Sequence, residues 1–413
     1  MAIGHPFSLG NRLAVVMVGL PARGKTYTAR KLARYLSWLG YRAQVFNVGN
    51  YRRQAVGSQV HHSFFDPDNT SGVAARRKVA TAAMDDMTEW MNSGGEIGIY
   101  DATNTTRHRR EWVTEHCSRH GIDVLFIELI CDTPDVIEAN IKETKLTAPD
   151  YAEVKADEAT ADFRARIDHY VQAYQPIVSE MVPFVKLIDM GRKVVTNRIE
   201  GYLMGRIVHY VMNLHPGIRP IWLTRHGQSQ SNVRGQIGGD EPLSGVGHQF
   251  SLNLASFITE LDPQKLVVWT SSLQRTVSTA KALNYPSVSL RSLDEIDAGI
   301  CDSMTYAQIE ERMPEDFAAR AEDKLRYRYP RGESYEDVIQ RVEPVLIELE
   351  RRTDPTLVIA HQAVLRALVA YFTAQPRERC PRLEIPLHTV IELTPKAYGC
   401  LEQRHRLGPD VLN

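Results

Sequence analysis

The sequence lacks any long uncharged apolar run, and none of its hydrophobic stretches approaches the ~20 residues that a membrane-spanning helix needs. Its first residues, MAIGHPFSLGNR, contain no basic region followed by an apolar core, which argues against a secretory signal. A formal net charge of -1 gives no reason to expect a nucleic-acid partner. These absences predict a cytoplasmic protein that binds neither membranes nor nucleic acid.

Cysteine is scarce, and internal repeats and low-complexity tracts are missing. The five cysteines are scattered and form no CxxC pair, which fits reduced thiols better than a disulfide framework or a zinc site. The content of 43% hydrophobic and 24% charged residues is typical of a soluble globular protein. Because 413 residues exceed what one core usually supports, we expect two domains.

The first half of the chain alternates short apolar runs with segments of helical period. The apolar run 13–18 leads into a glycine-rich loop, and apolar residues then recur at helical spacing from 29 to 39, before Gly40. Further strands are predicted at 45–48, 97–100, 124–130 and 185–188, and a helical segment at 76–91. This alternation predicts an α/β fold with a mainly parallel sheet covered by helices on both faces.

A linker is predicted at 213–220, where two prolines and a glycine interrupt the pattern. We place the boundary near Pro216, which gives domains of 1–215 and 216–413. Beyond it, apolar strands are predicted at 221–224, 266–270 and 356–360. Each is followed by polar residues, among them His226 and His361. Since ligands bind beyond the carboxyl ends of strands in open α/β sheets, these residues should converge on one pocket.

The glycine-rich loop carries the pattern GxxxxGK[ST] between a predicted strand and a predicted helix. In this pattern, backbone N–H groups and the positive end of a helix surround phosphate oxygens. Lys25 would then contact the β- and γ-phosphates of a nucleotide, and the Thr26 hydroxyl would coordinate Mg²⁺. The alternative is a glycine turn with a surface lysine.

Asp101 ends the predicted strand at 97–100, where a carboxylate can hold Mg²⁺ and deprotonate an acceptor hydroxyl. A solvated aspartate is the alternative. Polar residues that follow it suit a phosphorylated acceptor, namely Thr103, Asn104, Thr105 and Arg109. Arg52, Arg53, Arg76 and Arg77 add guanidinium groups that can bind phosphate bidentately, although any one of them can equally be a surface charge.

The second half offers the parts needed to hydrolyse a phosphate ester through a phosphohistidine: an imidazole, cationic donors and an acid. His226 follows a strand beside Arg225, and Arg275 and His361 follow two other strands. Nearby arginines favour the neutral imidazole that nucleophilic attack requires. Glu295 is the candidate acid, but its neighbours Asp294 and Asp297 are equally open to this role.

The two halves resemble the two halves of one known family. The runs 18–27, 46–53, 101–106 and 174–176 closely resemble the kinase half of the bifunctional 6-phosphofructo-2-kinase/fructose-2,6-bisphosphatases. The runs 237–240, 295–299, 327–337 and 386–390 resemble the bisphosphatase half, which belongs to the histidine phosphatase superfamily. The resemblance covers nearly the whole chain. It implies a P-loop kinase domain followed by a phosphoglycerate-mutase-like α/β domain.

For the first half, the resemblance implies that Asp101 is catalytic and, with Thr26, linked to Mg²⁺. It places Cys131 at the site, although by its sequence alone this residue is equally a buried strand cysteine. The implied ATP-binding residues are Gly19, Leu20, Pro21, Ala22, Arg23, Gly24, Lys25, Thr26, Tyr27, Asn140 and Lys145. Those implied for fructose 6-phosphate are Arg52, Arg76, Thr103, Arg109, Lys145, Arg166 and Tyr170.

For the second half, the resemblance implies that His226 is the nucleophile, Glu295 the proton donor and His361 a second catalytic imidazole. It places Arg225, Asn232, Gly238 and Arg275 around the transferred phosphoryl group. The implied sugar-bisphosphate residues are Tyr306, Arg320, Lys324, Tyr335, Gln362 and Arg366. No cofactor is expected for this reaction.

Together these features predict an enzyme that makes fructose 2,6-bisphosphate from ATP and fructose 6-phosphate and hydrolyses it back. Gln228 departs from the family, which usually has glutamate there, so the rate or pH optimum of hydrolysis is expected to differ. Control through phosphorylated tails is not expected, because little sequence flanks the family-like runs. A homodimer is an open alternative to a monomer.

Three other interpretations compete with this one. One half could bind ligand only as a regulatory module, but both halves keep their catalytic residue types. The distal half could instead be a phosphoglycerate mutase, against which the sugar-bisphosphate run at 326–337 argues. A scaffold protein would have little use for two intact phosphoryl sites.

Overall fold

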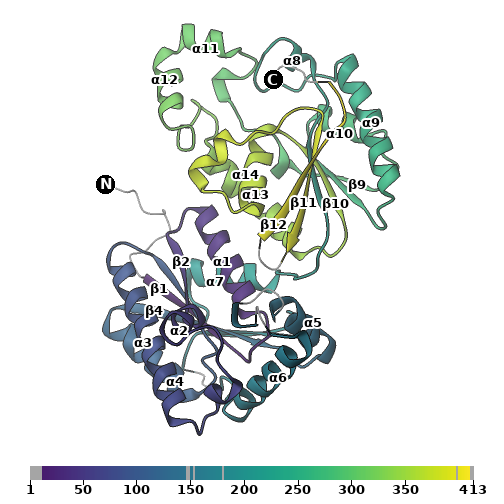
Figure 1. Cartoon of the computed structure of the whole chain (residues 1–413). Helices are drawn as coiled ribbons and strands as arrows, with labels where there is room; N and C mark the ends of the chain where they lie inside the picture. The colour runs from purple at the N-terminus through teal and green to yellow at the C-terminus, as the bar shows by residue number, and fades with distance from the viewer. Residues whose placement is uncertain (1–11, 146–148, 152–153, 179–180, 397–398, 410–413) are drawn as a thin grey trace. The chain divides into compact units, whose positions relative to one another are not determined.

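The computed structural model describes residues 12–145, 149–151, 154–178, 181–396 and 399–409, without the side chains of 143–145, 149 and 156. The chain divides into two compact units, Met1–Leu214 and His215–Asn413 (Figure 1). No helix in the described ranges is long and apolar enough to span a bilayer.

The first unit is built on a six-stranded sheet in the order β2-β3-β1-β4-β5-β6. All neighbouring strands are parallel except β5 and β6. The predicted mainly parallel sheet is therefore confirmed. The strands are β1 (Arg12–Val18), β2 (Ala43–Asn47), β3 (Ile97–Asp101), β4 (Ile122–Ile130), β5 (Phe184–Ile188) and β6 (Lys193–Asn197). Strand β6 was not predicted, because this short edge strand has no continuous apolar run.

Helices cover both faces of this sheet, as predicted. They are α1 (Lys25–Leu39), α2 (Val48–Val56), α3 (Thr70–Asn92), α4 (Arg107–Arg119), α5 (Pro134–Lys145), α6 (Ala156–Gln172) and α7 (Gly201–Met212), with 3-10 turns η1 (His62–Phe65) and η2 (Pro149–Tyr151). Alternate β1 residues, such as Val16, pack with α3 and α4. Helices α1 and α7 meet through the stacked rings of Tyr35 and Tyr210, 4.0 Å apart. The predicted strand at 45–48 begins two residues after β2 begins and ends one residue after β2 ends, because Asn47 caps α2 by accepting from the N–H of Asn50.

The second unit also has a six-stranded sheet, in the order β12-β11-β7-β10-β8-β9. Strands β7, β10, β8 and β9 run parallel, whereas β11 pairs antiparallel with β7 and β12. The antiparallel hairpin was not predicted. The strands are β7 (Ile221–Arg225), β8 (Val267–Thr270), β9 (Ser287–Ser289), β10 (Thr356–Ala360), β11 (Thr389–Lys396) and β12 (Gly399–Arg406).

Helices of the second unit likewise sandwich the sheet (Figure 1). They are α8 (Gln230–Val233), α9 (Gly245–Leu261), α10 (Gln274–Ala280), α11 (Tyr306–Arg312), α12 (Pro314–Glu322), α13 (Tyr335–Arg351) and α14 (Gln362–Phe372), with 3-10 turns η3 (Arg291–Leu293), η4 (Gly299–Cys301) and η5 (Arg377–Arg382). Phe250, Leu254 and Ile258 of α9 form one core with inward residues of β7, β8 and β10. The central parallel strands β7, β10 and β8 end side by side, so the residues that follow them lie at the same edge of the sheet, where a ligand site is expected.

Candidate active sites

The turn from β1 into α1 has a conformation that requires glycine at two positions. Gly19 has φ +137°, and a Cβ there would lie 2.5 Å from the carbonyl oxygen of Leu129. Gly24 has φ +81° and precedes the first residue of α1. The Gly19 N–H donates to the carbonyl oxygen of Thr103, which anchors the loop. The loop thus brings backbone and the start of α1 together, as a phosphate site requires.

Lys25, Thr26 and Asp101 form the centre of this first site. Burial lowers the pKa of Lys25 to about 7, against the opposing charge of Asp101, and its Nζ donates to the carbonyl oxygen of Leu20 at 2.6 Å. The Thr26 hydroxyl donates to Asp101 Oδ2 at 2.7 Å, and Asn47 Nδ2 donates to the same oxygen. Burial raises the pKa of Asp101 although these donors oppose it. The Thr26 hydroxyl oxygen and the Asp101 carboxylate oxygen are close enough together to coordinate one hard cation such as Mg²⁺.

Other residues predicted for nucleotide binding flank the loop. Asn140 Nδ2 donates to the carbonyl oxygen of Ala22 at 3.0 Å. Cys131 is buried just beyond β4, and burial lowers the pKa of Arg23 in the loop. Tyr27, near the start of α1, lies with its ring 5.7 Å from Lys31 Nζ. Lys145 ends α5, but its side chain lies outside the described part of the chain.

Three arginines converge on one buried carboxylate, Asp150. Arg52 Nη2 donates to both of its oxygens, at 2.8 and 2.7 Å. Arg53 and Arg166 approach it at 3.5 and 3.6 Å. Burial alone would raise the pKa of Asp150, but the hydrogen bond and charge of Arg52 and the other two cations lower it. The structure thus assembles guanidinium groups from α2 and α6 at one place.

Three arginines and a tyrosine lie around the ring of Phe65. We call these residues the arginine cluster: Arg52, Arg76, Arg166 and Tyr170. The Arg166 guanidinium stacks 3.7 Å from the centre of the Phe65 ring, and the Tyr170 ring lies 6.0 Å from it. Arg76 donates to the carbonyl oxygen of Phe64 at 3.0 Å, which turns it toward the same segment. Four of the predicted fructose 6-phosphate residues are therefore neighbours.

Two further residues predicted for fructose 6-phosphate have other contacts. Arg109 donates to the Tyr100 hydroxyl at 3.2 Å and lies over the Trp112 ring at 4.4 Å. Thr103 accepts through its carbonyl oxygen from the phosphate loop. Arg77, in contrast, is exposed on α3, as a surface charge would be. The hydrogen bond of Thr103 therefore connects the segment after β3, which ends at Asp101, to the glycine-rich loop that precedes Lys25.

In the second unit, His226 is buried at the end of β7 with its tautomer set by its neighbours. Its Nδ1 lies 2.7 Å from the carbonyl oxygen of Gly227, which can only accept, so Nδ1 carries the proton. Arg275 Nε, which can only donate, points at Nε2 from 3.1 Å. Burial and then the charges of Arg275 and Arg225 hold the pKa of His226 well below its usual value. The result is a neutral imidazole with its lone pair on Nε2.

His361 at the end of β10 lies beside His226, with ring centres 5.1 Å apart. Its Nε2 is 2.7 Å from the Ser271 hydroxyl, beyond β8, so all three predicted strand ends converge. Its Nδ1 has no protein partner among the described residues, although the side chain is fully buried. Burial, with the charge of Arg275 next, holds the pKa of His361 well below its usual value. A buried ring nitrogen without a partner is suited to a ligand.

Arginines and a glycine pair surround the two histidines. Arg225 is buried, its pKa is lowered to about 10 mainly by burial, and its Nη1 donates to the carbonyl oxygen of Ile385 at 3.2 Å. Arg275 Nη1 donates to the carbonyl oxygen of Gly239. Gly238 has φ +69°, and a Cβ there would overlap Asp302. Asn232 closes a capping box with Ser229 at the start of α8. Glycine at 238 thus lets the backbone pack against Asp302, which accepts from the Gly239 N–H.

The structure distinguishes the three neighbouring carboxylates. Asp294 accepts from the N–H and hydroxyl of Ser272, and the exposed Asp297 accepts from the N–H of Gly299. Glu295 instead accepts from the N–H groups of Gln362 and Ala363, at 3.1 and 3.2 Å, which begin α14 right after His361. Of the three, Glu295 is therefore the carboxylate held next to the second imidazole.

A second group of predicted residues forms a cationic and phenolic surface near α12 and α14. Arg320 donates to the hydroxyls of Tyr306 and Tyr329, at 2.9 and 2.8 Å. Arg366 Nη1 donates to the Tyr335 hydroxyl at 2.9 Å. Burial, with the charges of Arg366 and Arg320, lowers the pKa of Lys324 to about 8. Gln362, half-buried, opens α14 between these groups and Glu295.

Comparison with known proteins supplies the family. Residues 5–217 match the 6-phosphofructo-2-kinase family model, and residues 221–407 match branch 1 of the histidine phosphatase superfamily. The 6-phosphofructo-2-kinase/fructose-2,6-bisphosphatase of Gallus gallus is 48% identical over 97% of this chain and 86% of its own length. The chain belongs to that family.

A second relative matches over a similar extent. The 6-phosphofructo-2-kinase/fructose-2,6-bisphosphatase 1 of Rattus norvegicus is 47% identical over 97% of this chain and 85% of its own. Among solved structures, the alpha-ribazole phosphatase of Shigella flexneri matches 47% of this chain and all of its own, with 23% identity and a TM-score of 0.42. Members of the 6-phosphofructo-2-kinase/fructose-2,6-bisphosphatase family are bifunctional enzymes of fructose 2,6-bisphosphate metabolism, and their kinase domain uses ATP.

Sequence reasoning missed two residues that organise these sites. Asp150, which gathers the arginines, lies in a polar segment with no motif around it. Arg341 of α13 donates to both oxygens of Glu333 at 2.8 Å and to the carbonyl oxygens of Ser292 and Asp294, at 2.9 and 3.0 Å. It thereby fixes the segment that carries Glu295. Neither residue had a signal in the sequence, because both act through contacts distant along the chain.

Gln228, the departure from the family, is held by the start of α9. Its side-chain oxygen accepts from the Ser244 hydroxyl at 2.8 Å, and its N–H donates to His388 Nε2 at 3.2 Å. A glutamate here could accept the same hydroxyl. The substitution therefore changes charge near His226 more than it changes hydrogen bonding.

Proposed function

We propose that the two units divide the family's activities between them, with 6-phosphofructo-2-kinase in 1–215 and fructose-2,6-bisphosphatase in 216–413. The enzyme makes fructose 2,6-bisphosphate from ATP and fructose 6-phosphate and hydrolyses it again. The observation that carries the second assignment is the tautomer of His226: a neutral imidazole with its proton on Nδ1 and a guanidinium at Nε2.

Hydrolysis would begin with attack of His226 Nε2 on phosphorus of the 2-phosphate. The P–O bond to C2 breaks, and Glu295 gives its proton to the departing oxygen. Water then attacks the phosphohistidine, Glu295 takes up its proton, and the N–P bond breaks to release phosphate. Fructose 6-phosphate and phosphate are the products.

Several side chains would stabilise this reaction. Arg275, now 3.1 Å from Nε2, would transfer its hydrogen bond to a phosphoryl oxygen, assisted by Arg225 and by Asn232 and backbone at Gly238. His361 Nδ1, lacking a protein partner among the described residues, would donate to another oxygen. The remainder of the sugar bisphosphate would bind Tyr306, Arg320, Lys324, Tyr335, Gln362 and Arg366.

In the kinase unit, we assign ATP to the loop from Gly19 to Tyr27, with Asn140, Cys131 and Lys145 at its border. The Thr26 and Asp101 oxygens, 2.7 Å apart, would hold Mg²⁺, which neutralises phosphate charge when bound. Asp101 would also accept the proton of the 2-hydroxyl. Fructose 6-phosphate would bind the arginine cluster, with Thr103, Arg109 and Lys145 completing the site.

We further propose a cytoplasmic enzyme whose partners are these small molecules, on the basis of its composition and near-neutral charge. A homodimer is the open alternative to a monomer. Sedimentation of the purified protein decides between them.

Crossed inactivation tests the assignment of the two sites. His226→Ala should lower hydrolysis at least about 10⁴-fold, as expected for loss of a nucleophile, and leave kinase activity within about twofold. Asp101→Ala should do the reverse. In each variant, the retained activity shows that the unmutated unit is folded. Retained hydrolysis in His226→Ala would refute the phosphohistidine mechanism.

A further inference from the structure

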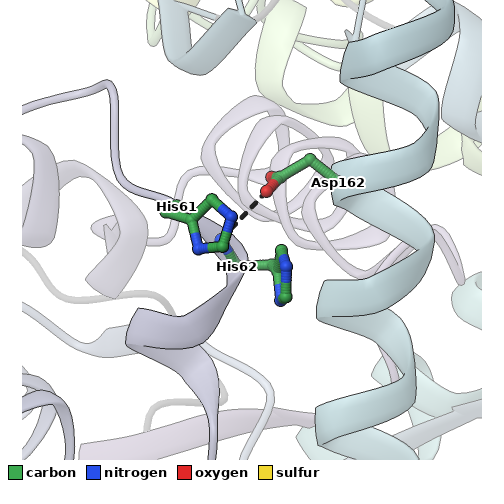
Figure 2. A group of neighbouring side chains, drawn as sticks. All are labelled: His61, His62 and Asp162. Carbon is green, nitrogen blue, oxygen red and sulfur yellow. Dashed lines mark hydrogen bonds between the residues drawn. The ribbon is translucent and has the colours of Figure 1, made fainter.

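A group of imidazoles and a carboxylate lies beside the arginine cluster and takes no part in either reaction. His61, His62 and Asp162 can each offer one ligand atom, and these atoms all lie within 4.8 Å of one another. Figure 2 shows the three side chains gathered between η1 and α6. His61 is exposed, whereas His62 and Asp162 are half-buried. Two histidines and an aspartate form a ligand set that suits borderline metals such as Zn²⁺.

Each of the three side chains already has a partner of the kind that orients a metal ligand. The Ser63 hydroxyl lies 3.0 Å from His61 Nδ1. His62 Nδ1 lies 3.1 Å from His169 Nε2, and His169 Nδ1 lies 3.7 Å from Asp66.

Asp162 has two such partners. The Tyr151 hydroxyl donates to its Oδ2 at 2.6 Å, and the His62 N–H donates to its Oδ1 at 2.9 Å (Figure 2). Each carboxylate oxygen therefore accepts one of these hydrogen bonds and retains a lone pair for a cation.

The contact between His62 and His169 selects the His62 ring nitrogen that would face a metal. With the proton of His62 on Nδ1, it donates to His169 Nε2, and the lone pair of His62 Nε2 becomes available. His61 Nδ1 accepts from the Ser63 N–H at 3.3 Å, so to bind a metal through Nε2 the exposed His61 ring must release this bond and carry its proton on Nδ1. His62 would then bind the metal and donate to the His169 imidazole, and the Asp66 carboxylate lies on the far side of His169.

We propose that His61, His62 and Asp162 bind a divalent transition-metal cation of the Zn²⁺ class, which ties η1 to α6. Ligands of tetrahedral zinc lie about 2.0–2.2 Å from the ion, so the three atoms must draw closer together than they are here. The exposed His61 side chain is free of the core and can make this movement. A water molecule would fill the fourth position. The same two elements carry Phe65 and Arg166, so the cation would also hold the arginine cluster in place.

Zinc binding to the untagged full-length protein tests this site. Competition with a chromophoric chelator, in excess Mg²⁺ and without substrate, should show one equivalent of Zn²⁺ bound. His61→Ala should weaken the affinity at least about tenfold, because loss of even an outer partner of a ligand costs 10- to 100-fold. Saturating Zn²⁺ should raise the melting temperature of the wild type and not that of His61→Ala.

Two more variants make the test specific. Asp162→Asn keeps an acceptor for one of its two hydrogen bonds and should weaken zinc binding in the same way. His120→Ala is the matched control, because His116 and His120 form another stacked imidazole pair, 4.6 Å apart on α4. Absence of zinc binding, equal affinity in the wild type and His61→Ala, or loss of zinc on His120→Ala would each overturn the proposal. None of these results depends on the kinase or phosphatase reaction.

Discussion

The two phosphate sites differ in how their buried charges are balanced. In the kinase unit, carboxylates stand beside the cations: Asp101 beside Lys25, and Asp150 beside Arg52 and Arg166. In the bisphosphatase unit, Arg225 and Arg275 surround two buried imidazoles that carry no charge. In the first site, the carboxylates lie among the cations. In the second, Asp240 lies 3.9 Å from Arg275 and Glu295 acts on both arginines, while the two imidazoles between them stay neutral.

This difference suits the two reactions. A kinase must exchange protein carboxylates for phosphates when its substrates arrive, and a compensated site remains stable while empty. A phosphohistidine enzyme needs a neutral imidazole, and burial together with the charges of nearby arginines disfavours its protonation.

The largest expected effect tests the single acid of the second site. Glu295→Gln should lower hydrolysis about 10²- to 10⁴-fold, because the departing oxygen loses its proton donor. Kinase activity of the same protein controls for folding. Asp294→Asn and Asp297→Asn are matched neighbours and should change hydrolysis less than about threefold. A comparable loss of hydrolysis in either variant would contradict the choice of Glu295 as the proton donor.

Removal of the compensating carboxylate tests the first site. Asp150→Asn should destabilise the kinase unit by about 3–5 kcal/mol, the cost of breaking a buried ion pair, and lower its melting temperature. Fructose 6-phosphate should then raise the melting temperature more than in the wild type, because its phosphate replaces the lost charge. Asp135→Asn, at the start of α5, is a control for aspartate loss. If fructose 6-phosphate raised the melting temperature equally in Asp150→Asn and the wild type, its phosphate would not be replacing the charge of Asp150.

Acid should destabilise the second unit through its buried histidines. The folded-state pKa values of His226 and His361 lie well below their unfolded value near 6.5, so below that pH the unfolded chain binds more protons. Stability is thus present above pH 6.5 and falls as the pH drops below it, by up to about 1.4 kcal/mol per pH unit for each histidine. Calorimetry between pH 7 and 5.5 measures this slope. It should decrease in His226→Ala and stay unchanged when the exposed His248 is replaced by alanine.

The smallest expected effect concerns Gln228. Gln228→Glu keeps the acceptor for Ser244 but adds a negative charge near His226. Repulsion of the bisphosphate should raise KM about two- to threefold, and the acid limb of the pH–rate profile should move to higher pH as imidazole protonation becomes easier. Gln230→Glu, two residues on, is the matched control. A pH profile identical to that of the wild type would show that this position does not influence the nucleophile.

Much of this fold could be predicted because its central strands are continuous apolar runs. The runs 13–18, 97–100 and 356–360 are buried strands in the structure. The edge strands β6 and β12 were missed, since β6 is partly exposed, β12 is mostly exposed and neither contains such a run. The convergence of His226, His361 and Ser271 followed from the rule that parallel strands end at one edge.

The sequence by itself determined the residue types of both sites, because the phosphate loop and the strand-end histidines are local patterns. Only the tertiary structure decided which of three adjacent carboxylates faces His361, and that Asp150 and Arg341 organise the two sites. Those choices depend on contacts between segments that are distant along the chain. Residue spacing within one segment does not predict such contacts. Burial, which also depends on the tertiary structure, then sets the charge states on which the chemistry depends.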